Sequence, residues 1–178
     1  MPTVTLIRHA MPHVDPTTDP AQWHLTDHAR TQAAALALPS GPRHHVASDE
    51  AKAIETLREL TTGPITADAR FGEVHRPRAR DGHTHRTLAA AYLAGTTHPG
   101  WEPRDHVAAR FAAAIADHLA TAGTAHLIVA THGMAMTIWL ATITDMPDPV
   151  AYWRALAFPD VITAALPAHW HPRPPATT

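Results

Sequence analysis

The chain has 178 residues, of which 45% are hydrophobic and 17% are charged, and its formal net charge at pH 7 is −2. This length predicts a single domain over residues 1–178 with a sizeable core, and the charge argues against a nucleic-acid or membrane partner. The chain has no cysteine, which excludes disulfides, thiolate catalysis and zinc–thiolate sites. Its first residues lack a signal-peptide pattern and no apolar run could span a bilayer, so a cytoplasmic location is expected.

The first third of the chain predicts two strands separated by a helix. Residues 3–8 are β-rich and predict a strand buried on both faces, and residues 11–24 hold prolines and aspartates typical of a loop. Thr26 is the predicted cap of a helix that runs to Leu38 and stops at the following Pro-Ser-Gly-Pro run. Residues 44–47 predict a second, short strand.

The middle of the chain predicts helices and a basic loop. Ser48 or Asp49 is expected to cap a helix that ends near Leu60, and residues 65–67 predict a short third strand. Residues 70–86 are polar and rich in basic side chains, so they predict either a solvated surface loop or a lid over an anionic ligand. Residues 87–93 are expected to be helical.

The last third continues the alternation of helix and strand. The pattern predicts helices at residues 102–119 and 134–143, and strands at residues 126–131 and 161–166. The proline-rich tail, residues 167–178, is expected to be extended and loosely held.

This order of elements predicts an α/β fold: a three-layer α/β/α sandwich with a mainly parallel sheet. Three strands end in polar side chains, namely Arg8-His9, Ser48-Asp49 and Thr131-His132. Ligands of such sheets bind beyond the carboxyl ends of the strands, so these side chains are expected to meet at one site. Arg8 offers a fork of donors suited to phosphate.

Five sequence elements, taken in order, resemble the histidine phosphatase superfamily, the phosphoglycerate-mutase-like proteins, and within it the short phosphatases. They are Arg8-His9-Ala10, Leu25-Thr26 with Gln32-Ala33, the run Ala47-Ser48-Asp49-Glu50-Ala51-Lys52-Ala53-Ile54-Glu55-Thr56, Phe71-Gly72-Glu73, and Thr131-His132-Gly133. The resemblance runs from about residue 3 to residue 143.

The resemblance implies a phosphatase that hydrolyses a small phosphorylated metabolite through a phosphohistidine, with no metal and no cofactor. It implies that His9 is the nucleophile, Glu73 the acid and base, and His132 a further catalytic group. It also implies that Arg8, Lys52 and Gly133 bind the substrate phosphate. Glu102 is a rival acid, although anchoring the long helix is the more plausible role for it.

The chain departs from the family pattern in several places, which leaves alternatives open. Ala10 and Ala29 replace glycines, Lys52 replaces an arginine, and Asp15 stands where the family often has asparagine. A lysine offers a point charge instead of a fork, and a carboxylate near phosphate would repel it unless it turns away. One alternative is therefore a non-catalytic phosphate-ligand binding or regulatory protein on the same fold. Another is a phosphatase that acts on phosphohistidine in proteins.

The sixteen histidines raise a third, weaker possibility, a histidine-rich metal protein. His83, His85 and the pair His44-His45 are the weak candidates for metal ligands, and solvated loop positions are the favoured interpretation.

Overall fold

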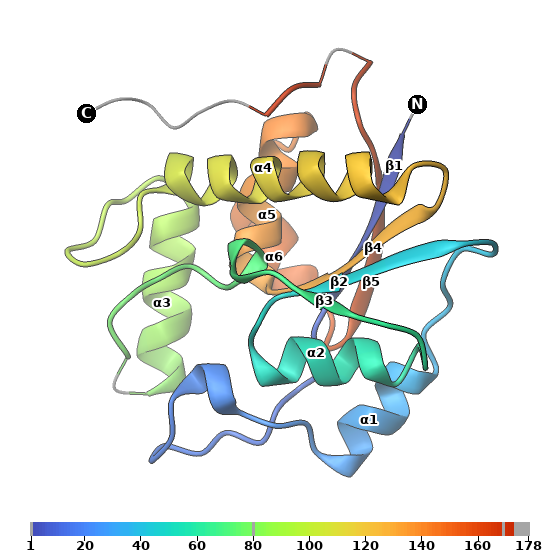
Figure 1. Ribbon diagram of the computed structural model, residues 1–178. Helices are drawn as coiled ribbons and strands as arrows, with labels where there is room; N and C mark the ends of the chain where they lie inside the picture. The colour runs from blue at the N-terminus through green and yellow to red at the C-terminus, as the bar shows by residue number, and fades with distance from the viewer. Residues whose placement is uncertain (1, 80, 169, 173–178) are drawn as a thin grey trace.

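A five-stranded sheet with the strand order β3-β2-β4-β1-β5 forms the middle layer of the molecule (Figure 1). The computed structural model describes residues 2–79, 81–168 and 170–172. The strands are β1 (Thr3–Arg8), β2 (Arg43–Ala47), β3 (Thr66–Ala67), β4 (His126–Thr131) and β5 (Asp160–Ala165). The strands β1 to β4 pair in parallel and β5 is antiparallel to β1, which confirms a mainly parallel sheet.

Helices cover both faces of this sheet, as Figure 1 shows. They are α1 (Asp27–Ala34), α2 (Ala51–Arg58), α3 (Gly82–Leu93), α4 (Arg104–Ala122), α5 (Gly133–Ile143) and α6 (Pro149–Ala155), with short 3-10 turns η1 (Pro20–Gln22) and η2 (Ala69–Phe71). The helices α4 and α5 lie on one side of the sheet, whereas α1 and α2 lie on the other. The predicted three-layer α/β/α fold is therefore confirmed.

The alternation of side chains along the strands builds a core on each face of the sheet. Val4 and Leu6 of β1 belong to the larger core, which includes Phe111 of α4 and Trp139 of α5. Ile7 points to the other face and packs in a smaller core with Leu57 of α2. Burying both faces fixes the sheet register, because a slip by one residue would exchange the two sets of side chains.

The register brings three strand ends to one edge of the sheet. Arg8 at the end of β1 pairs with Thr131 of β4, and Ala47 at the end of β2 pairs with Ala130 of β4. Two further backbone hydrogen bonds extend these ladders by one residue: His9 N–H donates to the Thr131 carbonyl at 3.0 Å and Ser48 N–H to the Ala130 carbonyl at 2.9 Å. The polar residues that follow the three strands therefore start from adjacent positions.

Several predicted element boundaries were wrong. The first helix is capped by Thr26 as predicted, but it ends at Ala34, not Leu38. The cap of α2 is Glu50, without a side-chain cap hydrogen bond, instead of Ser48 or Asp49. Ser48 is engaged elsewhere, because its Oγ lies 2.9 Å from Nε2 of His132.

The basic segment is not a loop throughout. The helix α3 begins at Gly82, inside the range predicted as loop or lid, because the Asp81 carboxylate accepts the N–H of Thr84 and caps the helix. The helix α6 was missed, although Asp148 caps it and Pro149 occupies its first turn. The assignment of residues 1–178 to one domain and the tail at 167–178 stay predictions; Arg80, residue 169 and residues 173–178 lie outside the described residues.

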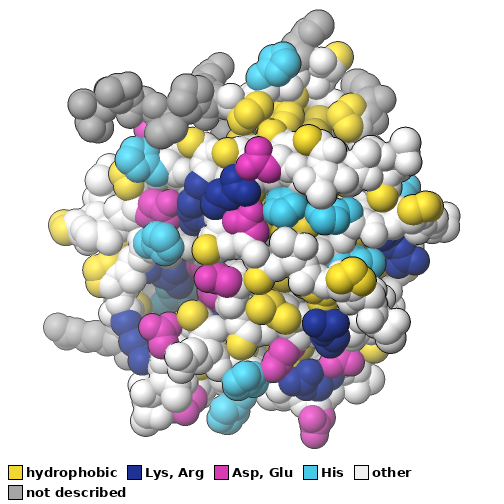
Figure 2. Space-filling view, in the orientation of Figure 1, with side chains coloured by type: hydrophobic (Ala, Val, Ile, Leu, Met, Phe, Trp, Pro, Cys, Tyr) yellow, Lys and Arg dark blue, Asp and Glu magenta, His cyan; other side chains and the backbone are white. Residues whose placement is uncertain are grey.

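The surface mixes charges of both signs. On the face shown in Figure 2, acidic and basic side chains are interspersed, with histidines between them. Among the described helices, none combines the length and apolar character needed to cross a membrane.

Candidate active site

His9 lies just beyond β1 with a defined tautomer. Its side chain is buried, and Nδ1 lies 2.8 Å from the carbonyl oxygen of Ala10. A carbonyl can only accept, so Nδ1 carries the proton and Nε2 keeps its lone pair. Burial, followed by His132, lowers the pKa of His9 well below its ordinary value; Lys52 and Arg8 add to this while the Ala10 carbonyl opposes it. The ring is therefore neutral at pH 7.

His132 faces His9 from the end of β4. The two ring centroids are 5.0 Å apart. Nε2 of His132 lies 2.9 Å from Ser48 Oγ and 3.2 Å from Glu50 Oε1. Burial, followed by the charge of Lys52, lowers the pKa of His132 to about 3, with Glu73 opposing the shift. The structure therefore brings together the two histidines that the sequence singled out.

The two buried histidines should make folding pH-dependent. A histidine whose pKa is lowered in the native state binds fewer protons than in the unfolded chain, so stability is complete above about pH 6.5 and falls below it. For His132, with a native pKa of about 3, the free energy of unfolding should drop by about 2 kcal/mol between pH 7 and pH 5. Urea titrations at both pH values test this, and His132→Asn should show a correspondingly smaller drop. An equal drop in the variant would contradict the assignment of a buried neutral His132.

Arg8 is held rigidly beside the histidines. Its NH1 donates to the carbonyl of Leu156 at 2.7 Å, and its guanidinium carbon lies 3.4 Å from the ring centroid of Phe158. Burial lowers its pKa to about 10, opposed by Glu73 and Asp160, so Arg8 stays charged at neutral pH. Its Nε is buried without a hydrogen-bond partner among the described residues, which leaves a fixed donor for a ligand.

Gly133 permits this placement of Arg8. A Cβ at Gly133 would lie 3.1 Å from Arg8 Nε, 3.2 Å from Arg8 Cζ and 3.1 Å from Trp153 Nε1. Such contacts are too tight for the side chains of Arg8 and Trp153 both to keep their positions.

We therefore expect Gly133→Ala to displace Arg8 and to weaken competitive inhibition by inorganic phosphate at least about tenfold, since each well-placed charged hydrogen bond contributes ~1.5–3 kcal/mol. The inhibition constant of phosphate against an aryl phosphate substrate measures this. In a half-buried control position away from the site, Gly63→Ala meets only the Thr61 hydroxyl at 3.3 Å and should leave the constant unchanged.

Lys52 points into the same region from α2. Its side chain is 7% exposed, and Nζ donates to the carbonyl of Pro20 at 2.7 Å and pairs with the carboxylate of Glu50. Its charge lowers the pKa of both His9 and His132, which places it within electrostatic range of both rings. The helix turn is braced by Thr56, whose hydroxyl donates to the Lys52 carbonyl at 2.7 Å and accepts the N–H of Ala10 at 2.9 Å.

Glu73 lies at the N-terminus of α5. Its carboxylate accepts the N–H groups of Ala135 at 3.0 Å, Met134 at 3.2 Å and Val74 at 2.9 Å. Burial alone would raise its pKa, but Arg76, His132 and the Val74 N–H together lower it. The backbone amides of Met134 and Ala135 at the start of α5 therefore hold the Glu73 carboxylate.

Glu102 has a different surrounding from Glu73. Its carboxylate accepts from Arg110 at 2.7 Å and 3.0 Å, and Arg110 also donates to the carbonyls of Gly72 at 2.9 Å and Glu73 at 3.1 Å. Glu102 thus anchors the segment that carries Glu73, and this arrangement favours Glu73 over Glu102 as the acid.

Asp15 is hydrogen-bonded within its own loop. Its carboxylate accepts the N–H of Thr17 at 2.8 Å and the Thr17 hydroxyl at 2.7 Å, and these bonds lower its pKa.

Some basic side chains of residues 70–86 make structural contacts, and another acts on the candidate site. Arg70 pairs with Asp68, and Arg78 donates to the carbonyls of Thr18 and Asp15, which ties this segment to the loop after His9. Arg76 lowers the pKa of Glu73 and of His132, so its charge acts on the candidate site.

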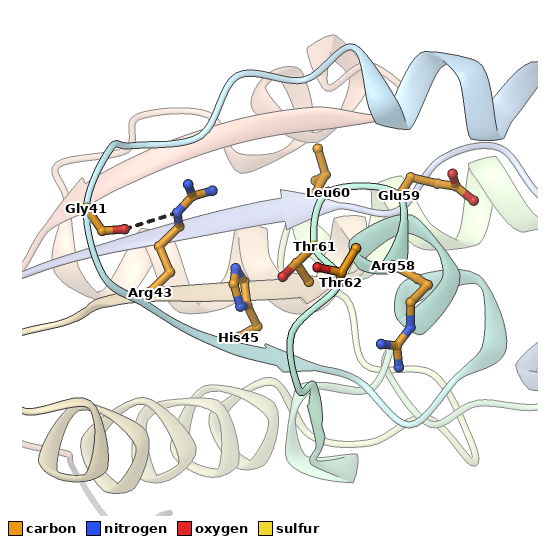
Figure 3. A pocket seen from close by; sticks show the side chains of 8 residues that line it. All are labelled: Gly41, Arg43, His45, Arg58, Glu59, Leu60, Thr61 and Thr62. Carbon is orange, nitrogen blue, oxygen red and sulfur yellow. Dashed lines mark hydrogen bonds between the residues drawn. The ribbon is translucent and has the colours of Figure 1, made fainter.

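A surface hollow lies away from the residues of the candidate active site. It has a volume of about 530 Å³ and is lined by Gly41, Arg43, His45, Arg58, Glu59, Leu60, Thr61 and Thr62. Figure 3 shows that its two guanidinium groups do not converge; Arg43 bonds the Gly41 carbonyl and Arg58 the Gly63 carbonyl. The hollow therefore lacks a preformed anion site.

The weak metal candidates do not gather into a site. Within the residues that the structure describes, no group of three or more His, Asp or Glu side chains is arranged to hold a metal ion. His44 instead contacts His118 at 3.1 Å, and His118 contacts Asp68 at 3.0 Å.

Two buried histidines, an arginine and a carboxylate meet at the carboxyl edge of the parallel sheet. This combination of groups is suited to binding an anionic phosphoryl group. The model of the histidine phosphatase superfamily (branch 1) matches residues 4–160, and the chain belongs to this family. No curated protein matches the sequence.

The fold is also found in solved structures of low sequence identity. A mycobacterial glucosyl-3-phosphoglycerate phosphatase has a TM-score of 0.67 at 24% identity over 95% of this chain and 91% of that chain. YhfR of Bacillus stearothermophilus has a TM-score of 0.67 at 19% identity over 84% of each chain. A phosphoserine phosphatase of Entamoeba histolytica, in complex with phosphoserine, has a TM-score of 0.66 at 16% identity over 92% of this chain and 90% of that chain. At these identities the likeness establishes the fold alone.

Sequence reasoning missed two contributors to the site. Glu50 was quoted without a role, and Phe158 was not singled out. Ser48 was expected at the site because it follows a strand end, and its Oγ does contact His132. Glu50 and Phe158 carry no such local signal.

Proposed function

We propose that the chain is a phosphatase that hydrolyses a small-molecule phosphomonoester through a phosphohistidine intermediate on His9, without a metal ion. Membership in the histidine phosphatase superfamily supports the phosphatase class. The observation that carries the mechanism is the bond from His9 Nδ1 to the Ala10 carbonyl, at 2.8 Å, which leaves Nε2 unprotonated.

The surroundings of His9 suit a phosphoryl group. Arg8 Nε and His132 Nδ1 are buried and have no hydrogen-bond partner in the described ranges, and unsatisfied buried atoms of this kind are characteristic of ligand sites. Arg8 and Lys52 supply fixed positive charge where negative charge develops during transfer. These cations can take the role that a metal ion has in other phosphatases.

In the proposed reaction, Nε2 of His9 attacks phosphorus, the N–P bond forms, and the bond from phosphorus to the ester oxygen breaks. Glu73 takes up a proton from solvent when the substrate binds and gives it to the leaving oxygen. Water then attacks the phosphohistidine, Glu73 takes a proton from it, and the N–P bond breaks to release phosphate. When phosphate leaves, Glu73 returns this proton to solvent, so Glu73 and His9 return to their starting states and the cycle balances.

The first test is hydrolysis of p-nitrophenyl phosphate in EDTA between pH 5 and pH 7.5. Turnover that persists in EDTA is the expected result, and loss of turnover that a divalent metal restores would contradict a metal-free mechanism. A folded protein that binds phosphate without any turnover would favour the alternative of a phosphate-ligand binding protein. A screen of phosphorylated metabolites beside a phosphohistidine-carrying protein would separate the small-molecule proposal from a phosphohistidine-protein phosphatase.

A further inference from the structure

Glu50 places a second acidic group, beside Glu73, at the proposed phosphate site. Its side chain is 14% exposed, and both carboxylate oxygens are engaged. Oε2 pairs with Lys52 Nζ, and Oε1 lies 3.2 Å from His132 Nε2 and accepts the Glu73 N–H at 3.0 Å. Glu50 therefore contacts two of the groups that the proposed function assigns to the phosphoryl oxygens.

The positive charges of Arg8 and Lys52 are already matched by two carboxylates before any substrate enters. Arg8 and Lys52 contribute two positive charges, while Glu50 and Glu73 contribute two negative charges and the two histidines are neutral. Arg76 adds one further cation within electrostatic range. A phosphomonoester dianion that reaches Lys52 must therefore approach a carboxylate that is in contact with the same ammonium group.

We propose that Glu50 is an internal counter-anion that pairs with Lys52 in the free protein and competes with the substrate phosphate for this ammonium group. This inference rests on the proposed function and deepens it, because it names the residue that limits phosphate affinity. On binding, a phosphoryl oxygen takes over the contact with Lys52, and Glu50 keeps the Glu73 N–H.

The contacts of Lys52 indicate that Glu50 competes with phosphate for this lysine and is not needed to hold it in place. Nζ already donates to the Pro20 carbonyl at 2.7 Å, so Lys52 has a second anchor that does not depend on Glu50. The stem of Lys52 is also buried, since the residue is 6% exposed. Removing the Glu50 charge should leave Lys52 in place and free its charge for a ligand.

The matched variants are Glu50→Gln and Asp49→Asn. The first keeps the shape and an oxygen that can accept the Glu73 N–H. The second removes the same charge from the adjacent residue, which is exposed and makes no hydrogen bond or ion pair within the described part of the chain. Glu50→Ala is the second site variant, and circular dichroism with thermal unfolding shows that each variant is folded.

Isothermal titration with inorganic phosphate measures affinity without turnover. Glu50→Gln is expected to bind phosphate at least about tenfold more tightly than the wild type, a change of about 1.4 kcal/mol. Glu50→Ala should change in the same direction, and Asp49→Asn should stay within about twofold of the wild type. The KM for p-nitrophenyl phosphate should fall in parallel with the dissociation constant.

Weaker or unchanged phosphate binding by both Glu50 variants would overturn the proposal, and weaker binding would identify Glu50 as a positioning residue for Lys52. Turnover by the wild type shows whether the counter-anion role of Glu50 fails alone or the proposed phosphatase function fails with it. If the wild type hydrolyses p-nitrophenyl phosphate while the Glu50 variants do not gain affinity, the counter-anion is refuted and the proposed function stands. If neither turnover nor phosphate binding is found in any variant, both fail.

Relative to Lys52→Gln alone, the double variant Glu50→Gln/Lys52→Gln should gain less than about threefold in phosphate affinity, because the cation for which Glu50 competes is absent. A full gain without Lys52 would mean that Glu50 acts on phosphate through general repulsion, and would overturn competition for Lys52.

Discussion

Replacing His9 by alanine is expected to reduce phosphatase turnover at least about 10³-fold while the protein remains folded. His9 combines a neutral imidazole, a free Nε2 and two neighbouring cations, Lys52 and Arg8. The measurement is kcat/KM for p-nitrophenyl phosphate, with thermal unfolding as the check on the fold.

His9→Asn is the sharper companion variant. Its amide can donate to the Ala10 carbonyl as Nδ1 of His9 does, at 2.8 Å in the wild type, but it offers no nucleophile. His13→Ala, an exposed position in the following loop, controls for the loss of a histidine. Near-wild-type turnover in both His9 variants would show that the nucleophile has been assigned wrongly.

Replacing Glu73 by glutamine should separate substrates by their leaving group. An alkyl phosphate needs a proton on its leaving oxygen, so its kcat/KM should fall by about 10²–10⁴-fold, whereas the kcat/KM of p-nitrophenyl phosphate should fall less than about tenfold. The amide cannot accept all three N–H groups that hold Glu73, so thermal stability should also fall slightly. Steady-state kinetics on both substrates provide the comparison.

The pH dependence of this step follows from the lowered pKa of Glu73. Burial opposes the shift, but Arg76, His132 and the Val74 N–H keep the carboxylate ionised at neutral pH in the free protein. Proton donation then improves as the pH falls, so wild-type turnover of an alkyl phosphate should rise between pH 7 and pH 5. Glu73→Gln should lose this rise. If Glu102→Gln shows the leaving-group dependence and Glu73→Gln does not, the acid is Glu102.

The sequence was sufficient to predict the sheet and the meeting of His9 with His132. Both residues directly follow β-rich segments, and parallel strands bring their carboxyl ends to one edge whatever the intervening chain does. Arg8 of β1 pairs with Thr131 of β4, so His9 and His132, which follow them, start from adjacent positions.

The electrostatics of the site could not be predicted from the sequence. Glu50 sits two residues before Lys52, a spacing at which helical side chains do not face each other. It reaches Lys52 because Glu50 is the cap of α2 with an extended backbone, not a residue inside the helix. The predicted cap at Ser48 or Asp49 concealed this, whereas Ser48 was already expected near His132 because both follow strand ends.

The boundaries that failed have a similar cause. Residues 82–86 were assigned to a loop from their basic composition, but Asp81 and Thr84 supply the cap that starts α3. The helix α6 has an Asp148-Pro149 start signal that was not used. In both cases a backbone N–H donates to an aspartate carboxylate, and this cap decides where the helix begins whatever the average composition of the segment.

The central claim is that a phosphoryl group passes through His9, and trapping the intermediate tests it most directly. Wild type and His9→Asn would be mixed with p-nitrophenyl phosphate, quenched in alkali within milliseconds and digested for mass spectrometry under alkaline conditions. We expect one acid-labile phosphoryl group on His9 in the wild type and none in the variant. Turnover with no phosphoryl group on His9, or with one on another residue, would contradict the mechanism.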